Sequence, residues 1–263
     1  MAPWQQPFVT FYAFLVGAVI GSFLNVVIHR VPRRLSIVRP GSACPGCSQA
    51  IRWYDNIPMI SWLILRARCR SCGQPISMRD PLVEVAAALM AAAAVHRWGL
   101  SVLSIEVVVF SWVSLALALI DLEHQLLPDV MTYPSIAFGL VASWLGGFTT
   151  ILYSVLGAVV GALLPITVIL LYRWLRGEEG MGWGDVKYLA AIGAVVGVRD
   201  CVWVLVMAAV AGALVGGVLW ASGRGSGKTA LPFGTFLAAS VIAWLYLPEA
   251  WRMAIRMIGQ PGY

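Results

Sequence analysis

Long apolar stretches recur along nearly the whole chain of 263 residues, separated by short polar segments. A helix needs about 20 apolar residues to cross a bilayer. On that basis the pattern predicts eight transmembrane helices, the sixth of them short. Their expected bounds are roughly 8–28, 82–98, 100–120, 131–147, 150–172, 186–198, 201–220 and 233–248. The fold expected is therefore an all-α polytopic membrane protein, with a small cytoplasmic cysteine-bearing segment after the first helix.

The composition agrees with this interpretation. Hydrophobic residues make up 60% of the chain and charged residues 11%, whereas about a quarter of a soluble domain is charged. No Lys or Arg precedes Arg30, so the first apolar run lacks the basic start of a signal peptide and is read as a permanent span. The net charge of +6 would suggest nucleic acid in a soluble protein. Here we expect the lipid bilayer as a partner and no nucleic acid.

The distribution of basic residues predicts the orientation. Of the 18 Lys and Arg residues, 14 lie in the segments 29–81, 121–130, 173–187 and 221–232. Basic residues are enriched on the cytoplasmic side, so these segments are expected there. Segment 30–80 is the only loop long enough to fold by itself. We therefore expect a first helix at 1–29, a cytoplasmic zinc-binding segment at 30–80 and a seven-helix membrane domain at 81–263.

Four of the five cysteines form two pairs in segment 30–80. Cys44 and Cys47 form the first pair, and Cys69 and Cys72 the second, in a C-x2-C-x21-C-x2-C pattern. This spacing is typical of a structural four-thiolate zinc site. The alternative is four free thiols in a reducing compartment.

Two acids interrupt apolar sequence where charge is costly. Asp121 ends the third predicted span, and Asp185 heads the sixth. Ionisable groups at membrane depth mark functional sites by default. If the two carboxylates meet, one can act as a general base while the other keeps a proton, and proteolysis then needs no metal or cofactor. The alternative is that both are helix-end acids facing headgroups.

The residues around Asp185 are candidates for substrate binding. Gly182 and Gly184 remove side-chain bulk, so a peptide backbone could approach the carboxylate. Lys187 follows by two positions, so on a helix its side chain diverges from that of Asp185 and meets a headgroup or another segment. Glu178 and Glu179 come just before the glycines. They are expected to belong to an acidic rim.

Several motifs together resemble one known family. Asp121–Asp129 and Gly182–Lys187 resemble the two signature motifs of the bacterial type IV prepilin peptidases, which are GxGD-type aspartyl proteases. The order and spacing of further matching pieces extend the resemblance over nearly the whole chain. These pieces are Gly21–Arg30, Trp53–Pro58, Pro81–Glu84 and Pro232–Gly234.

The resemblance implies a bifunctional enzyme of the bacterial inner membrane, with its active site at the cytoplasmic face. Members cleave the basic leader from type IV prepilins and type II secretion pseudopilins, then N-methylate the new N-terminus with S-adenosylmethionine. By motif position, Asp121 and Asp185 are the catalytic pair. The methyl donor is implied by the resemblance alone. Where the family often has a glycine this chain has Ala67, which puts methyl transfer in question.

Two other functions stay open at this point. One is a GxGD membrane peptidase without methyltransferase activity, and the other is a metal-handling transporter that uses the two acids as ligands. Glu84, one turn into a span, is either a helix-start acid or an interior polar contact. Ser222–Thr229 resembles a phosphate-binding loop but lacks the first glycine, and we read it as a flexible basic loop. Oligomeric state is not predicted.

Overall fold

The computed structural model describes residues 6–177, 181–223 and 231–257. Within these ranges the chain is helical, and its only β-type pairings are two isolated bridges, Ala43 with Ala50 and Arg68 with Pro75. The chain forms two compact units, residues 1–108 and 109–263. We call them the N-terminal and the C-terminal unit. Glu178 and Glu179 lie outside the described residues.

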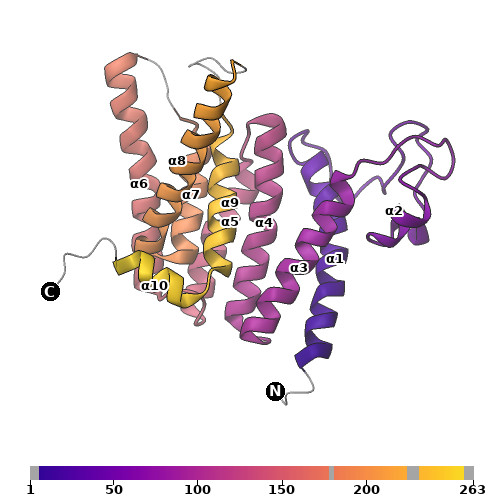
Figure 1. The fold of residues 1–263 in the computed structure, drawn as a ribbon, viewed down its shortest axis with the longest axis horizontal. Coiled ribbons are helices and arrows are strands. Elements are labelled where there is room, and N and C mark those ends of the chain that lie inside the picture. The colour runs from indigo at the N-terminus through magenta and orange to yellow at the C-terminus, as the bar shows by residue number, and fades with distance from the viewer. Residues whose placement is uncertain (1–5, 178–180, 224–230, 258–263) are drawn as a thin grey trace. The chain divides into compact units, whose positions relative to one another are not determined.

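The N-terminal unit is built on two long helices, α1 (Gln6–Arg30) and α3 (Arg79–Trp98), which lie side by side (Figure 1). Glycines allow their backbones to touch. A Cβ atom on Gly17 would lie 2.7 Å from the carbonyl oxygen of Ala87, and one on Gly21 would lie 2.6 Å from the Cα of Glu84. Small residues at such crossings are the usual means of close packing between membrane helices.

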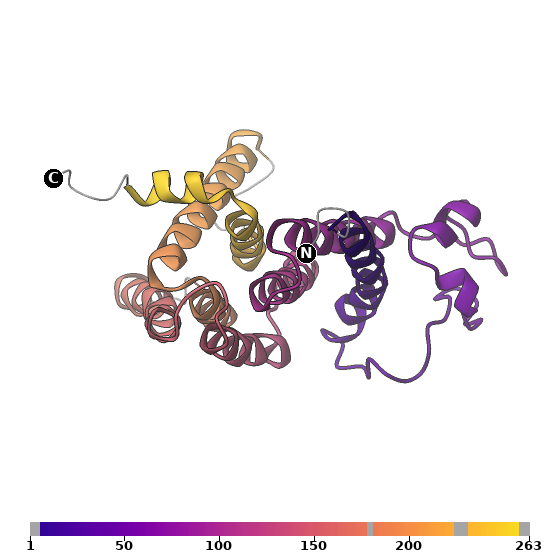
Figure 2. The ribbon, with the colours of Figure 1, turned by 90° about the horizontal axis from the view of Figure 1, so that it is seen from below.

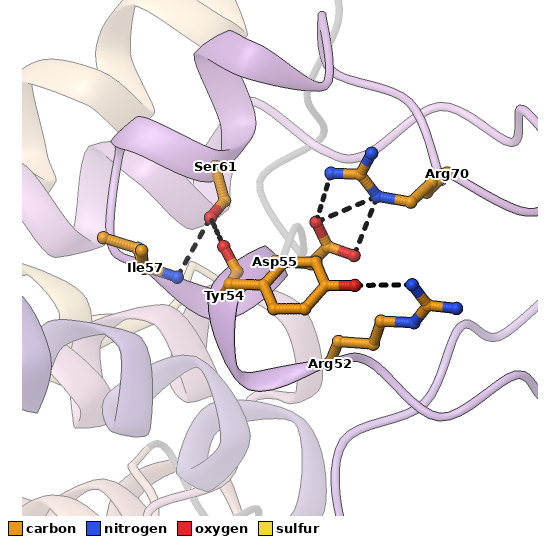
Figure 3. Close-up of polar contacts among 6 residues, drawn as sticks. All are labelled: Arg52, Tyr54, Asp55, Ile57, Ser61 and Arg70. Carbon is orange, nitrogen blue, oxygen red and sulfur yellow. Dashed lines mark hydrogen bonds and ion pairs between the residues drawn. The ribbon is translucent and has the colours of Figure 1, made fainter.

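Between these helices the chain forms a 3-10 turn, η1 (Trp53–Asn56), and a short helix, α2 (Ile60–Ile64). Polar pairs hold this segment together (Figure 3). The guanidinium of Arg70 binds the carboxylate of Asp55 through Nε and Nη2, with Nη2 2.6 Å from Oδ1. The hydroxyl of Ser61 donates to the carbonyl of Tyr54 at 2.9 Å and accepts the N–H of Ile57 at 3.0 Å.

The C-terminal unit is organised around α7 (Trp183–Val196). Val186 and every residue from Tyr188 to Val196 are buried. Figure 2 views the bundle end-on and shows the neighbouring helices around α7. Gly157 and Gly193 bring α6 and α7 into backbone contact, since a Cβ on either would overlap the carbonyl of the other. The neighbours are α5 (Asp129–Trp144), α6 (Ile151–Arg176), α8 (Val198–Ala221) and α9 (Phe233–Tyr246).

A final helix, α10 (Glu249–Met257), turns by 114° from α9 and runs across the ends of the bundle (Figure 1). Arg256 fixes it by a two-point ion pair with Asp200, at 2.9 Å and 2.5 Å. Asp200 is only 2% exposed. This ion pair joins α10 to the first turn of α8, so α10 does not continue the direction of α9.

Each of the eight predicted spans coincides with a helix, but the helices differ in length. Four of the described helices are long and apolar enough to cross a membrane, namely α1, α4 (Val102–His124), α6 and α8, or five if the bent pair α9–α10 counts as one. The others are shorter, with 20 residues in α3, 16 in α5 and 14 in α7. Length and composition thus show a multi-pass helical protein.

Candidate functional site

Asp121 lies in the last turn of α4 and is 5% exposed. Its partner is Thr235 at the start of α9. The Thr235 N–H donates to Oδ2 of Asp121 at 2.8 Å. The Thr235 hydroxyl lies 3.2 Å from the same oxygen and 3.0 Å from the carbonyl of Ala118, so it can donate to either. These donors fix the orientation of the carboxylate and favour its charged form.

Asp185 lies in the first turn of α7, where Gly182 is the capping residue. Its own N–H donates to the carbonyl of Gly182 at 3.1 Å. A Cβ atom on Gly182 would lie 3.4 Å from Oδ2 of Asp185, in ordinary contact. Asp185 is half-buried. From the first turn of the helix its carboxylate can therefore reach a cavity.

The two acids line the same cavity. It has a volume of about 700 Å³, and the two carboxylates are close enough for one charge to act on the other. Small residues of α8 form part of its wall, among them Gly212 and Gly216. Two like charges sharing a site favour one proton held between them. The arrangement therefore suits acid–base attack on a peptide carbonyl.

Contact with Leu127 leaves no room for a side chain at two of the glycines near the acids. A Cβ on Gly184 would lie 2.9 Å from the Cβ of Leu127, and one on Gly234 would lie 2.8 Å from its Cδ1 and 3.0 Å from Oδ2 of Asp121. The Leu127 side chain thus fits between α7 and α9. Gly184 packs against it and is not among the residues lining the cavity, whereas Gly182 is.

Lys187 points away from the acids. Its Nζ donates to Oδ1 of Asp129 at 2.6 Å and lies 5.1 Å from the ring centre of Tyr133. It therefore joins α7 to the first turns of α5, as the divergence from Asp185 suggested. Lys187 does not line the cavity that holds the acids.

The four paired cysteines meet in one cluster. Their Sγ atoms all lie within 4.8 Å of one another, and those of Cys44 and Cys72 are 3.7 Å apart. A tetrahedral zinc with Zn–S bonds of 2.3 Å requires sulfurs about 3.8 Å apart. The N–H groups of Cys47 and Gly46 lower the pKa of the Cys44 thiol to about 6, which favours its thiolate. The backbone at Gln74 acts in the same direction on Cys72, but the neighbouring Cys47 thiol and burial outweigh it and raise the pKa of Cys72 to about 12.

The two cysteine pairs have the same backbone. In each, the first cysteine donates its N–H to the carbonyl five residues on, Gln49 or Gln74. The residue four positions on donates back to the cysteine carbonyl and takes a positive φ, 56° at Ser48 and 72° at Gly73. Two such turns present their sulfurs to a common centre, as the sequence spacing predicted.

Some contacts had no clear sequence signal. Thr235 follows the noted Pro232–Gly234 motif, but nothing in the sequence connects it with Asp121. Leu127 lies within the first signature motif as an ordinary apolar residue. Both are identified by tertiary contacts between helices that are distant in the chain.

Two family models match the chain. Residues 15–98 match the bacterial peptidase A24 N-terminal domain, and residues 108–217 match the type IV leader peptidase family. Relatives named prepilin leader peptidase/N-methyltransferase include one from Pseudomonas putida, 38% identical over 94% of each chain. One from Burkholderia pseudomallei is 38% identical over 89% of this chain and 84% of its own. One from Myxococcus xanthus is 40% identical over 85% of this chain and 67% of its own. The comparison with solved structures finds no match.

Proposed function

The chain belongs to the family of bacterial type IV prepilin leader peptidases, and we infer that it cleaves prepilin leaders and methylates the new N-terminus. Its substrates on this basis are type IV prepilins and type II secretion pseudopilins. The observation that carries the peptidase role is the shared cavity of Asp121 and Asp185, which come from separate helices. A transporter would use two such acids as ion ligands, but that leaves the family match unexplained.

We assign the two acids different roles. Asp121 accepts the Thr235 N–H on Oδ2, so it is the member that stays charged and activates water. Asp185 keeps the shared proton and polarises the scissile carbonyl. The pair titrates as a unit, and the reaction needs no metal or cofactor. Gly182 lines the cavity beside Asp185, where its lack of a side chain leaves room for the substrate backbone.

Two bound groups are proposed in addition, a zinc ion and S-adenosylmethionine. Zinc fits the cysteine cluster, because four sulfurs within 4.8 Å of one another suit a closed tetrahedral site. Such a site is structural and takes no part in cleavage. S-adenosylmethionine is the methyl donor, and it supplies an electrophilic methyl group on a sulfonium ion.

We propose that all eight apolar segments cross the bacterial inner membrane, with both acids at the cytoplasmic face. The 14 residues of α7 extend about 21 Å, less than a bilayer core of about 30 Å. Because α7 is buried among other helices, the segments that flank it can complete the crossing inside the protein. The division into residues 1–29, 30–80 and 81–263 belongs to this same proposal, with segment 30–80 in the cytoplasm.

An acidic rim is proposed to attract the basic leader. Glu123 and Asp129 belong to it, and Glu178 and Glu179, outside the described residues, come just before α7 in the sequence. Lys187 pairs with Asp129. Through that pair it would set the charge that the rim presents to the substrate.

One assay tests the function. The purified protein is incubated in detergent with a prepilin and S-adenosylmethionine, and the product is weighed by mass spectrometry. Loss of the leader together with one added methyl group is expected. Leader loss without methylation would leave only the peptidase, and an intact substrate would overturn the proposal.

A further inference from the structure

The charged face of α10 lies against the bundle. Its three charged residues, Glu249, Arg252 and Arg256, occupy positions i, i+3 and i+7 and so share one face of the helix. Arg252 is buried, with its guanidinium carbon 4.7 Å from the ring centre of Phe148 in the turn between α5 and α6. Arg256 forms the two-point ion pair with Asp200 at the start of α8. This face of α10 is therefore fixed against the ends of other helices.

The opposite face of α10 is apolar and exposed. It carries Trp251, which is 64% exposed, and Met257, which is 67% exposed, with Ala254 exposed between them. A helix on the surface of a soluble protein has the reverse arrangement, with its apolar side against the core and its charges outward. The outer face of α10 therefore suits an apolar medium and not water.

Exposed tryptophans indicate where this apolar medium ends. Trp144 ends α5, four residues before Phe148, and is exposed like Trp251. Three more exposed tryptophans lie at the opposite end of the C-terminal unit, which holds the acids: Trp174, Trp183 and Trp220. Tryptophan is enriched at both interfaces between membrane and water. Trp251 therefore lies at the level of the interface remote from the acids.

The length of α9 gives the depth of α10. The helix α9 begins beside the acids, since the N–H of Thr235 donates to Asp121, and its 14 residues extend about 21 Å. With both acids at the cytoplasmic face, α9 ends about 9 Å short of the far side of a bilayer core of about 30 Å. The chain then turns by 114°, and α10 runs across the bundle (Figure 2). Amphipathic helices that lie in the membrane plane bury their apolar face to a similar depth, about 5–10 Å.

We propose that α10 lies in the plane of the membrane and binds the lipids of the leaflet remote from the acids, through Trp251, Ala254 and Met257. Its depth rests on the cytoplasmic position of the acids in the proposed function. The partner is the boundary between acyl chains and headgroups, where an indole ring lies in apolar surroundings and its N–H reaches polar groups. Arg199 is exposed beside Asp200, and long basic side chains at helix ends extend to this interface. The helix α10 thereby holds the ends of α8 and α9 at one side of the bilayer.

A depth measurement tests the proposal. The full chain with Trp251→p-acetylphenylalanine, which carries a nitroxide label, is reconstituted in liposomes of phosphatidylethanolamine and phosphatidylglycerol. Electron paramagnetic resonance compares collisions of the label with oxygen, which concentrates in lipid, and with a water-soluble nickel chelate. The same label at Val210, exposed in the middle of α8, gives the lipid reference, and at Trp53, exposed in segment 31–78, the water reference.

The ratio of oxygen to nickel collisions decides the outcome. We expect the ratio at position 251 to be several-fold above that at Trp53 and close to that at Val210. A ratio at position 251 equal to that at Trp53 would place the apolar face in water and overturn the proposal.

Photo-crosslinking identifies what covers the apolar face. The full chain with Trp251→p-benzoylphenylalanine is irradiated in the same liposomes, and the intact product is weighed by mass spectrometry. A mass increase of one phospholipid supports the proposal. A crosslinked pair of chains would show that a second copy covers the face and would overturn it, as would a chain of unchanged mass. The same photoreactive residue at Val210 is the control, since it should give the lipid adduct.

Paired substitutions separate burial in lipid from loss of packing. Trp251→Glu and Trp251→Gln remove the same indole and differ from each other only in charge. A charge inside the bilayer is costly, so the Glu variant should melt several degrees below the Gln variant in liposomes. Trp53→Glu and Trp53→Gln should melt together, because segment 31–78 is proposed to lie in the cytoplasm. Equal melting temperatures for the two Trp251 variants would contradict the lipid contact.

These results are independent of the peptidase assay. A wild-type protein that cleaves a prepilin, combined with a water-accessible label at position 251, would overturn this inference and leave the proposed function standing. A lipid-facing label in a protein that leaves the prepilin intact would support the inference and overturn the function.

Discussion

The two units reach an ordered site by different physical means. In the C-terminal unit, α7 is buried by neighbouring helices, and Asp121 and Asp185 are positioned by helix packing. Segment 31–78 of the N-terminal unit has little apolar core, with Trp53 81% exposed and Ile64 69% exposed. Its order depends on hydrogen-bonded turns, the Arg70–Asp55 pair and four clustered thiols. Packing defects should therefore damage the site of Asp121 and Asp185, whereas loss of metal should damage the cysteine cluster.

The largest effect expected is on the acids. Asp121→Asn or Asp185→Asn should each reduce leader cleavage on the order of 10⁴-fold, and the two losses should not add, because the carboxylates act as a unit. Methylation of a pre-cleaved pilin should continue, because methyl transfer does not use the two carboxylates. Single-turnover cleavage followed by mass spectrometry measures both. Substantial cleavage by either single variant would remove that acid from the mechanism.

Metal removal should instead disorder the cysteine-bearing segment. Replacing Cys44 or Cys69 by Ser should lower the zinc content from about one ion per chain to none, because such sites need all four ligands. Segment 31–78 should become protease-sensitive, because the cluster no longer holds its two turns together, while leader cleavage continues. Elemental analysis measures the zinc, limited proteolysis measures the order of the segment, and the mass-spectrometric assay measures cleavage. Cys201→Ala is the control, since Cys201 is buried in α8 apart from the cluster. Zinc-free protein whose segment 31–78 resists protease as the wild type does would contradict the prediction.

The contrast between the units also explains what sequence could predict. The cysteine spacing predicted the cluster because its ligands lie in two local turns. The family motifs identified Asp121 and Asp185, but their meeting depends on α4 and α7, which are separated by two helices. Thr235 and Leu127 were missed for the same reason. The apolar pattern located eight helices, including a short sixth, yet it could not show that other helices enclose α7.

One glycine variant in each unit tests whether the two units act independently. Gly184→Ala would overlap Leu127, and overpacking of this kind costs about 1–3 kcal/mol. Cleavage should fall about 5- to 150-fold, with methylation unchanged. Adding Leu127→Ala should restore part of the cleavage by making room. Gly21→Ala would instead press on the backbone at Glu84, so it should loosen the packing of α1 against α3 and spare cleavage. If each variant impairs both activities equally, the two units do not act independently.

Thr235 tests how firmly Asp121 must be held. Thr235→Val removes the hydroxyl but keeps the backbone N–H that donates at 2.8 Å. One neutral hydrogen bond is worth about 0.5–1.5 kcal/mol, so cleavage should fall about 2- to 10-fold. The pH–rate profile should also shift, because a donor to Asp121 is lost. Thr235→Ser should restore both. A slower variant with an unchanged profile would indicate a packing role only.

The smallest effect is expected at Lys187. Its ion pair with Asp129 joins a half-buried ammonium group to a carboxylate that is 59% exposed, and such pairs near the surface contribute about 0–1 kcal/mol. Lys187→Gln should therefore change cleavage of a pilin without a basic leader less than about 5-fold. With a basic leader, the freed Asp129 carboxylate adds negative charge to the rim, and KM should fall, more so at low salt. Asp129→Asn is the matched variant, since it also breaks the ion pair but leaves Lys187 unpaired, and should raise KM. If Lys187→Gln raises KM for every leader, Lys187 itself binds the substrate, and its pairing with Asp129 is incidental.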